Sequence, residues 1–75
     1  MTEDQLDEVI FSLLKSRWRK VVAFVTDAEK RFKELGWTIT YEATAARLQV
    51  LSDLDRIESA GDLRYWSNSE VRLKD

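Results

Sequence analysis

The sequence predicts a mostly α-helical α+β domain of the winged helix-turn-helix type, in which three helices precede a C-terminal β-hairpin. Apolar residues recur at every third or fourth position in three stretches before residue 55, and this spacing is typical of amphipathic helices. After residue 55, apolar and polar residues alternate on both sides of Gly61, which is the pattern of paired strands. The chain of 75 residues has the length of one domain, so we treat residues 1–75 as a single unit.

The composition excludes several kinds of chemistry. The chain contains no cysteine, which excludes disulfides and thiolate metal ligands, and no histidine, which is the usual general base. Its net charge is −2, and only residues 16–36 carry a basic excess. No apolar run approaches the roughly 20 residues that span a bilayer, and the N-terminus is acidic. We therefore expect a cytoplasmic protein without a membrane segment.

The first helix is expected over about residues 3–14. Thr2 is a suitable N-cap, and Gln5 three positions later completes a capping box. The apolar stripe of this helix consists of Leu6, Val9, Ile10 and Leu13.

The second helix is expected over about residues 17–35, with Ser16 as its N-cap and Gly36 just beyond its end. The most regular apolar stripe in the chain lies here and consists of Trp18, Val21, Val25, Ala28, Phe32 and Leu35. The basic residues on its other side are Arg17, Lys20, Lys30 and Lys33. We interpret that side as a solvated face rather than a nucleic-acid patch, because three acidic residues balance its charge.

The third helix is expected over about residues 41–54, after an N-cap at Thr40. Its first apolar row contains Ala43, Ala46, Val50 and Leu54, and its second contains Tyr41, Ala45, Leu48 and Leu51. A helix this apolar is either enclosed by the other elements or keeps one side for a partner, and we expect it to be enclosed. Just before it, Trp37–Ile39 has the residue types of a short strand, which would pair near residues 71–73.

A β-hairpin is expected over about residues 56–73. Its tightest turn is placed at Ala60–Asp62, because Gly61 can adopt a positive φ and Asp62 can bond to nearby backbone. Ile57 and Leu63 would then face the helices from the two strands.

The polar side and the last strand of the hairpin are expected to support its register. Glu58 and Arg64 would form a cross-strand ion pair in water, worth a few tenths of a kcal/mol. The run Glu70–Leu73 alternates again, which predicts a final short strand with Val71 and Leu73 directed inward.

The C-terminal run also resembles a known family. Residues 56–73 contain the patterns Arg-x-Glu-x-x-Gly-Asp-Leu-Arg and Ser-Glu-Val-Arg-Leu. This run resembles the C-terminal signature of a bacterial domain-of-unknown-function family, number three-six-five-eight, although Tyr65–Trp66 is bulkier than that family's pattern between the two halves. Trp18–Val21 and Ala46–Leu48 resemble two further motifs of the family. The resemblance covers most of the chain and implies a fold but no activity, because the family has none established.

No group of residues predicts catalysis. Ser69 and Glu70 lack a base that would activate a hydrolytic nucleophile. The carboxylates of Glu58, Asp62 and Glu70 do not have the spacing of a calcium loop, and two isolated glycines cannot form a phosphate loop. We interpret Asp62 as a turn residue and the other charges of the hairpin as cross-strand ion pairs. The expectation is a protein that is not an enzyme, with no catalytic residue, no cofactor and no metal.

The order of elements places the third helix as the recognition helix of a winged helix and the hairpin as its wing. Duplex DNA is nevertheless disfavoured, because this helix offers only Arg47 against several acidic residues. We expect a non-catalytic interaction module that binds a protein partner or a second copy of itself. The alternative is a nucleic-acid-binding accessory or regulatory protein that uses the second helix and the wing.

Exposed Trp, Tyr and Arg side chains commonly anchor protein interfaces. The candidate partner-binding residues are therefore Trp37, Arg47, Arg64, Tyr65, Trp66 and Arg72. Because adjacent strand residues point to opposite faces, Tyr65 and Trp66 cannot both be buried. We expect Trp66 to mark the partner surface.

Overall fold

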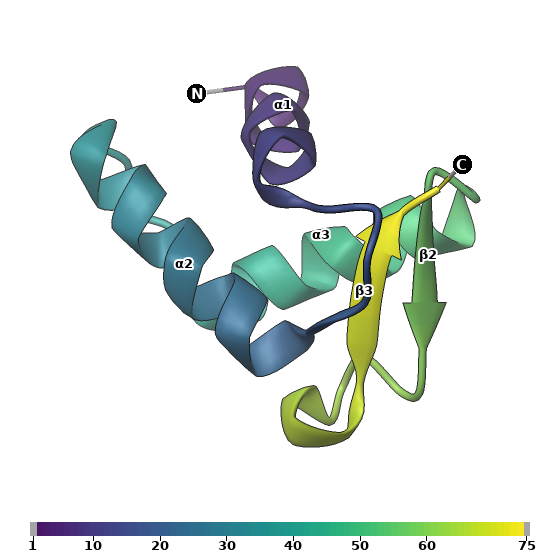
Figure 1. The fold of residues 1–75 in the computed structure, drawn as a ribbon. Helices are drawn as coiled ribbons and strands as arrows, with labels where there is room; N and C mark the ends of the chain where they lie inside the picture. Colours follow the sequence, from purple (N-terminus) through teal and green to yellow (C-terminus); the bar gives the residue numbers. More distant parts are fainter. Residues whose placement is uncertain (1, 75) are drawn as a thin grey trace.

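The computed structural model describes residues 2–74 (Figure 1). The helices are α1 (Glu3–Leu13), α2 (Val21–Glu34) and α3 (Tyr41–Asp53), with a short 3-10 helix, η1, at Trp66–Asn68. The strands are β1 (Arg19–Lys20), β2 (Ile57–Ala60) and β3 (Glu70–Leu73). They form an antiparallel sheet in the order β1-β3-β2. The predicted α+β class with a winged-helix-like layout of three helices and a C-terminal hairpin is confirmed.

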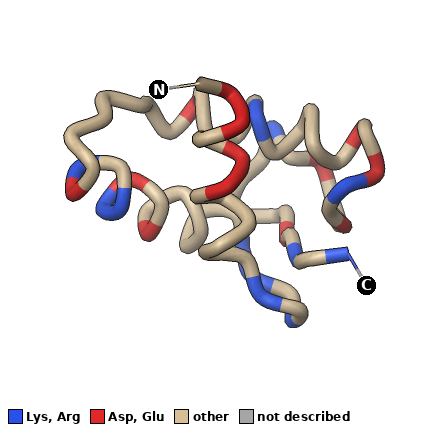
Figure 2. The backbone as a smooth tube through the Cα atoms, turned by 90° about the horizontal axis from the view of Figure 1, so that it is seen from above, with Lys and Arg blue, Asp and Glu red and all other residues tan. Residues whose placement is uncertain are grey.

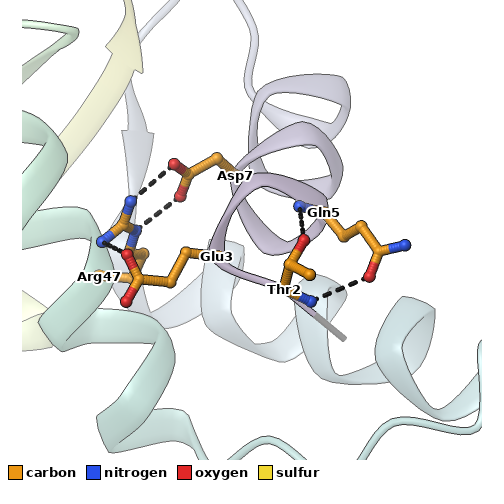
Figure 3. Close-up of polar contacts among 5 residues, drawn as sticks. All are labelled: Thr2, Glu3, Gln5, Asp7 and Arg47. Atoms are coloured by element: carbon orange, nitrogen blue, oxygen red, sulfur yellow. Dashed lines mark hydrogen bonds and ion pairs between the residues drawn. The ribbon is translucent and has the colours of Figure 1, made fainter.

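The starts of α1 and α3 are set by the two predicted N-caps. The Thr2 hydroxyl accepts a hydrogen bond from the Gln5 backbone N–H (3.2 Å), and the Gln5 side-chain oxygen accepts one from the Thr2 N–H (2.9 Å; Figure 3). The Thr40 hydroxyl accepts a hydrogen bond from the Ala43 N–H at 3.0 Å. These bonds satisfy N–H groups that the first turn of a helix leaves without a partner, and both expected starts are confirmed.

The start of the second helix was predicted wrongly, because its expected first turn contains the strand β1. β1 pairs with β3, and α2 follows directly from Val21. The N-cap is therefore Lys20, which makes no side-chain capping bond, and not Ser16. The strand predicted at Trp37–Ile39 is also wrong, because β1 occupies that edge of the sheet and residues 37–39 belong to the loop before α3.

The connection between β2 and β3 is long, and the predicted tight turn at Ala60–Asp62 is wrong. β2 pairs with β3 so that Ile57 lies opposite Leu73 and Ala60 lies opposite Glu70. Residues 61–69, which we call the wing, lie between the two strands and contain η1. The alternation over residues 63–66 therefore does not correspond to a strand.

The ion pairs of the hairpin follow this register. Glu58 lies opposite Arg72 and accepts a hydrogen bond from its Nε (2.8 Å), and the ion pair brings Arg72 Nη2 within 2.7 Å of Glu58 Oε2. The predicted Glu58–Arg64 pair is therefore wrong, because Arg64 pairs with Asp62 on the wing. The final strand is confirmed, with Val71 fully buried and Leu73 partly buried.

The hydrophobic core lies where the three helices meet the sheet. Its largest fully buried side chains are Phe24, Phe32, Ile10, Leu48 and Leu51. α3 contributes only one of its two apolar rows to this core, whereas the row that includes Ala46 and Val50 is exposed. α3 does pack between α2 and β2, but the expectation that it keeps no side free is wrong, because its outward side forms part of the molecular surface.

Candidate interaction groove between α3 and the wing

A groove of about 410 Å³ runs between the outward side of α3 and the wing. It is lined by Glu42, Ala45, Ala46, Gln49, Leu63, Arg64 and Trp66. We call its apolar members the floor, which comprises Ala45, Ala46, Leu63 and Trp66, and its charged and amide members the rim. A depression with an apolar floor and a few polar rim groups is the usual form of a site that takes up apolar parts of a partner.

The wing side of the groove is shaped by Asp62. One carboxylate oxygen accepts the Arg64 backbone N–H at 2.9 Å, and the other accepts Arg64 Nη2 at 2.6 Å. The side-chain hydrogen bond from Arg64, with the backbone bond as the second cause, lowers the pKa of Asp62 to about 2. The Asp62 carbonyl oxygen also accepts the Tyr65 N–H at 2.9 Å. Asp62 therefore has the turn-forming role that we predicted, in a longer turn.

The far end of the wing is anchored by Ser69, which is fully buried. Its hydroxyl donates to the Tyr65 carbonyl oxygen at 2.9 Å, and the same oxygen accepts the Asn68 N–H at 3.0 Å. The Ser69 carbonyl oxygen accepts the N–H of Val21, the first residue of α2, at 3.0 Å. The first two bonds close the wing on itself, and the third connects it to the start of α2.

The two aromatic residues of the wing have different surroundings. Trp66 packs partly against the core, and its ring meets that of Tyr41 edge-on, with 5.9 Å between the ring centroids. Tyr65 is 60% exposed. The prediction that one of the two faces water is confirmed, and the exposed one is Tyr65, whereas Trp66 forms part of the groove floor.

The α3 side of the groove carries acidic and amide side chains. Glu42 and Gln49 line it, and the Gln49 amide donates at 2.8 Å to Oδ1 of Asp53, an exposed residue one turn further along α3. Arg47, the only base of α3, turns toward α1, where its Nε and Nη2 donate to the carboxylate of Asp7 at 2.6 and 2.7 Å (Figure 3). The hydrogen bond to Asp7 raises the pKa of Arg47. The groove is therefore bordered by uncompensated negative charge on its α3 side.

The structure brings three of the six predicted partner-binding residues together. Arg64, Tyr65 and Trp66 are consecutive on the wing, and Arg64 lies with its guanidinium carbon 5.9 Å from the centre of the Tyr65 ring. Arg47 lies on the other side of α3, in the ion pair with Asp7. Its side chain serves the contact between two helices and is not part of the groove.

The other two predicted residues lie elsewhere on the molecule. Trp37 stacks on Phe32 beside the core, with 5.9 Å between the ring centroids. Arg72 lies on β3, where it pairs with Glu58. Sequence reasoning missed Ala46 as part of the groove floor, and the signal that could have identified it is the second apolar row of α3, since only one row is needed to face a core.

Comparisons with known proteins identify no relative. No family model, no curated protein and no solved structure matches the chain. The resemblance to the domain-of-unknown-function family therefore stays a prediction, and the function has to be inferred from the chemistry of the surface.

The described part of the chain, residues 2–74, contains no group of three acidic side chains placed to hold a metal ion. Glu58 and Asp62 are instead paired with arginines, at Arg72 and Arg64 respectively. None of the helices between residues 2 and 74 combines the length and the apolar character that crossing a membrane requires.

Proposed function

We propose that this domain is a non-catalytic interaction module that binds a segment of a protein partner in the groove between α3 and the wing. One observation carries the proposal. The side of α3 that would enter the major groove of DNA in a helix-turn-helix protein carries Glu42 and Asp53, carries no base, and borders an apolar depression. We also propose that the protein is located in the cytoplasm.

The charges argue against reading of duplex DNA through α3. Affinity for DNA comes largely from Lys and Arg side chains that neutralise phosphates. Two carboxylates on the outward side of α3 would instead repel the phosphates, and Arg47 is engaged with Asp7. On the wing, Arg64 is paired with Asp62, so that pair adds no net positive charge.

The alternative, nucleic-acid binding through α2 and the wing, has weaker support from the contacts of α2. Lys33 is paired with Glu29 at 3.0 Å, and Arg31 is 3.8 Å from Glu34. Such exposed pairs are weak, but they leave the charge of this part of the helix close to balanced. The protein-binding proposal does not depend on these residues.

The chemistry of the groove favours an amphipathic helix with basic flanks as the bound segment. Ala45 and Ala46 are small, which lets a partner backbone approach α3 closely, and Trp66 offers a broad apolar surface opposite them. A helix laid in such a groove places apolar residues at positions i, i+3, i+4 and i+7 on the floor. Lysine or arginine beside this stripe would face Glu42 and Asp53, which gives the complementarity of charge that selects a partner.

The test is binding of a synthetic peptide of about 18 residues that carries a leucine stripe flanked by lysines. Labelled peptide is titrated with the full chain, and binding is followed by fluorescence anisotropy. The decisive variant is Ala46→Arg, which places a long charged side chain on the groove floor. The matched control is Ala43→Arg, because Ala43 is exposed on the same helix, does not line the groove, and receives the same added charge.

Saturable binding that Ala46→Arg abolishes and Ala43→Arg preserves supports the proposal. A peptide with glutamates in place of the lysines should bind several-fold more weakly. Equal affinities for the two variants, or no binding of the lysine peptide, would overturn it. If the chain instead self-associates in sedimentation experiments and Ala46→Arg prevents this, the occupant of the groove is a second copy and not a separate protein.

A further inference from the structure

Trp18 is a large aromatic residue that the core does not use. The sequence pattern predicts it as the first member of the buried stripe of the second helix, but it precedes β1 and lies outside the cluster of packed core side chains. The residue is 39% exposed. Trp18 therefore presents part of its ring to solvent at a position outside the hydrophobic core.

The Trp18 ring packs against the side chain of Arg72, which is itself paired with Glu58. The guanidinium of Arg72 lies 4.5 Å from the ring centre, a cation–π contact. Arg72 is in turn held by Glu58, with 2.7 Å between Arg72 Nη2 and Glu58 Oε2. The indole therefore meets solvent as a pre-positioned surface, and an incoming group does not have to order it first.

The residues around Trp18 are strongly basic. Residues 15–20 carry four bases and no acid, and in Figure 2 the Lys and Arg positions gather on the loop that leads from α1 into α2. Arg19 is paired with Asp27 at 2.5 Å. Lys15, Arg17 and Lys20 form no ion pair with any residue between 2 and 74, although the backbone of Lys20 lies opposite that of Glu70 in the sheet.

This basic surface is separate from the groove. In Figure 1, the segment from α1 to α2 passes in front of β3, whereas α3 runs behind the sheet. The three unpaired bases of this loop, Lys15, Arg17 and Lys20, therefore lie on one side of the domain, and Glu42 and Asp53 lie on the side formed by α3. An anionic partner is attracted to the first side only, so whatever binds there differs from the partner of the groove.

We infer that the loop of residues 15–20, which includes Trp18, forms a binding surface for single-stranded nucleic acid together with Arg72 of β3. Proteins that bind single strands combine bases that contact the phosphates with an aromatic ring on which a nucleobase stacks. Here Lys15, Arg17 and Lys20 supply the positive charge and Trp18 supplies the ring. An anionic bilayer fits less well, because a surface anchor buries a whole row of apolar side chains and this loop exposes only Trp18 among them.

The test measures binding of a fluorescein-labelled oligothymidylate of about ten nucleotides to the full chain in low salt, by anisotropy. If Lys15, Arg17 and Lys20 each neutralise one phosphate, a plot of the logarithm of the binding constant against the logarithm of the salt concentration should have a slope of about −2. Trp18→Ala should weaken binding about tenfold, because loss of one stacked base removes an interaction of this size. Trp18→Phe should retain most of the affinity, and it also checks that the fold survives replacement of the indole.

The matched charge control compares Arg17→Gln with Lys30→Gln. Lys30 is exposed on α2, outside the basic loop, and forms no ion pair between residues 2 and 74, so both variants remove one unpaired positive charge. Arg17→Gln should weaken binding and make the salt slope shallower, whereas Lys30→Gln should do neither. The inference is overturned if the oligonucleotide does not bind, or if Trp18→Ala and Arg17→Gln bind it as tightly as the parent chain. It is also overturned if anionic phosphatidylglycerol vesicles or polyglutamate bind through Trp18 while the oligonucleotide does not.

Discussion

Arg47 on α3 and Asp7 on α1 form a two-point ion pair between helices whose residues are 40 positions apart in the chain. The side chains are 18% and 7% exposed, and Arg47 Nη1 is also 3.4 Å from Glu3 (Figure 3). The single base of α3 is therefore used to hold two helices together. Because Arg47 is turned away from the outward side of α3, the charged side chains on that side are the acids Glu42 and Asp53. Their negative charge is the basis of the proposed preference for a basic partner.

Replacing Arg47 by methionine should lower the free energy of unfolding by about 3 kcal/mol, because the nearly buried carboxylate of Asp7 then lacks its partner. Urea denaturation measures this loss. The double variant Arg47→Met with Asp7→Leu removes both charges and should be more stable than Arg47→Met alone. Additive losses in the double variant would show that the two side chains do not stabilise each other.

The two glycines should respond very differently to substitution by alanine. Gly61 has φ of 80°, and a Cβ there would overlap the carbonyl oxygen of Asn68 across the wing. Gly36 has φ of 75°, but a Cβ there meets no atom within 4 Å. Gly61→Ala should therefore cost more than about 2 kcal/mol, whereas Gly36→Ala should cost only the backbone strain of about 1 kcal/mol. Equal midpoints in urea for the two variants would contradict the close packing of the wing.

Asp62 should titrate at unusually low pH. Its side-chain and backbone hydrogen bonds from Arg64 lower its pKa from the ordinary 3.8 to about 2. A carboxyl group with a lowered pKa contributes stability above its unfolded value, and this contribution is lost as the pH falls from about 4 toward 2. Carbon-detected NMR of the Asp62 carboxyl group should give a midpoint near 2. Arg64→Gln should return the midpoint toward 3.8, and a parent midpoint already at that value would refute the bond.

Reversing the charge on the outward side of α3 should exchange the preference for partners. In the variant with Glu42→Lys and Asp53→Lys, the lysine-flanked peptide should bind about threefold more weakly for each exposed charge. Binding of duplex DNA at low salt should become stronger, since α3 then presents bases to the phosphates. Both affinities follow from anisotropy titrations. Unchanged affinity for the peptide would show that these two acids play no part in selecting it.

The helices could be predicted from the sequence where local signals are strong. Thr2 and Thr40 are capping residues at the starts of apolar stripes, and both helices begin where these residues place them. The start of α2 could not be found in the same way, because Trp18 and Val21 happen to keep helical spacing. The strand β1 exists only because β3, some fifty residues later, supplies its hydrogen bonds, and two residues leave no local pattern.

The candidate groove could be predicted only in part. Arg64, Tyr65 and Trp66 were identified as partner-binding candidates because of their residue types, but the alternation around them indicated a strand and not a loop. Their true position follows from Ser69, whose buried hydroxyl closes the wing through a bond that no periodicity reveals. The two apolar rows of α3 were visible in the sequence, but which of them faces the core depends on how the helix packs.

The measurement that tests the protein-binding proposal most directly is a two-dimensional amide NMR titration of the full chain. The lysine-flanked leucine peptide and a mixed-sequence DNA duplex are added in separate experiments at low salt. The proposal predicts that the peptide shifts the resonances of Ala46, Leu63 and Trp66 saturably, and that the duplex leaves them unchanged. Saturable shifts of the same three residues with the duplex, weakened steeply by salt, and none with the peptide, would contradict the proposal and identify this side as a nucleic-acid surface.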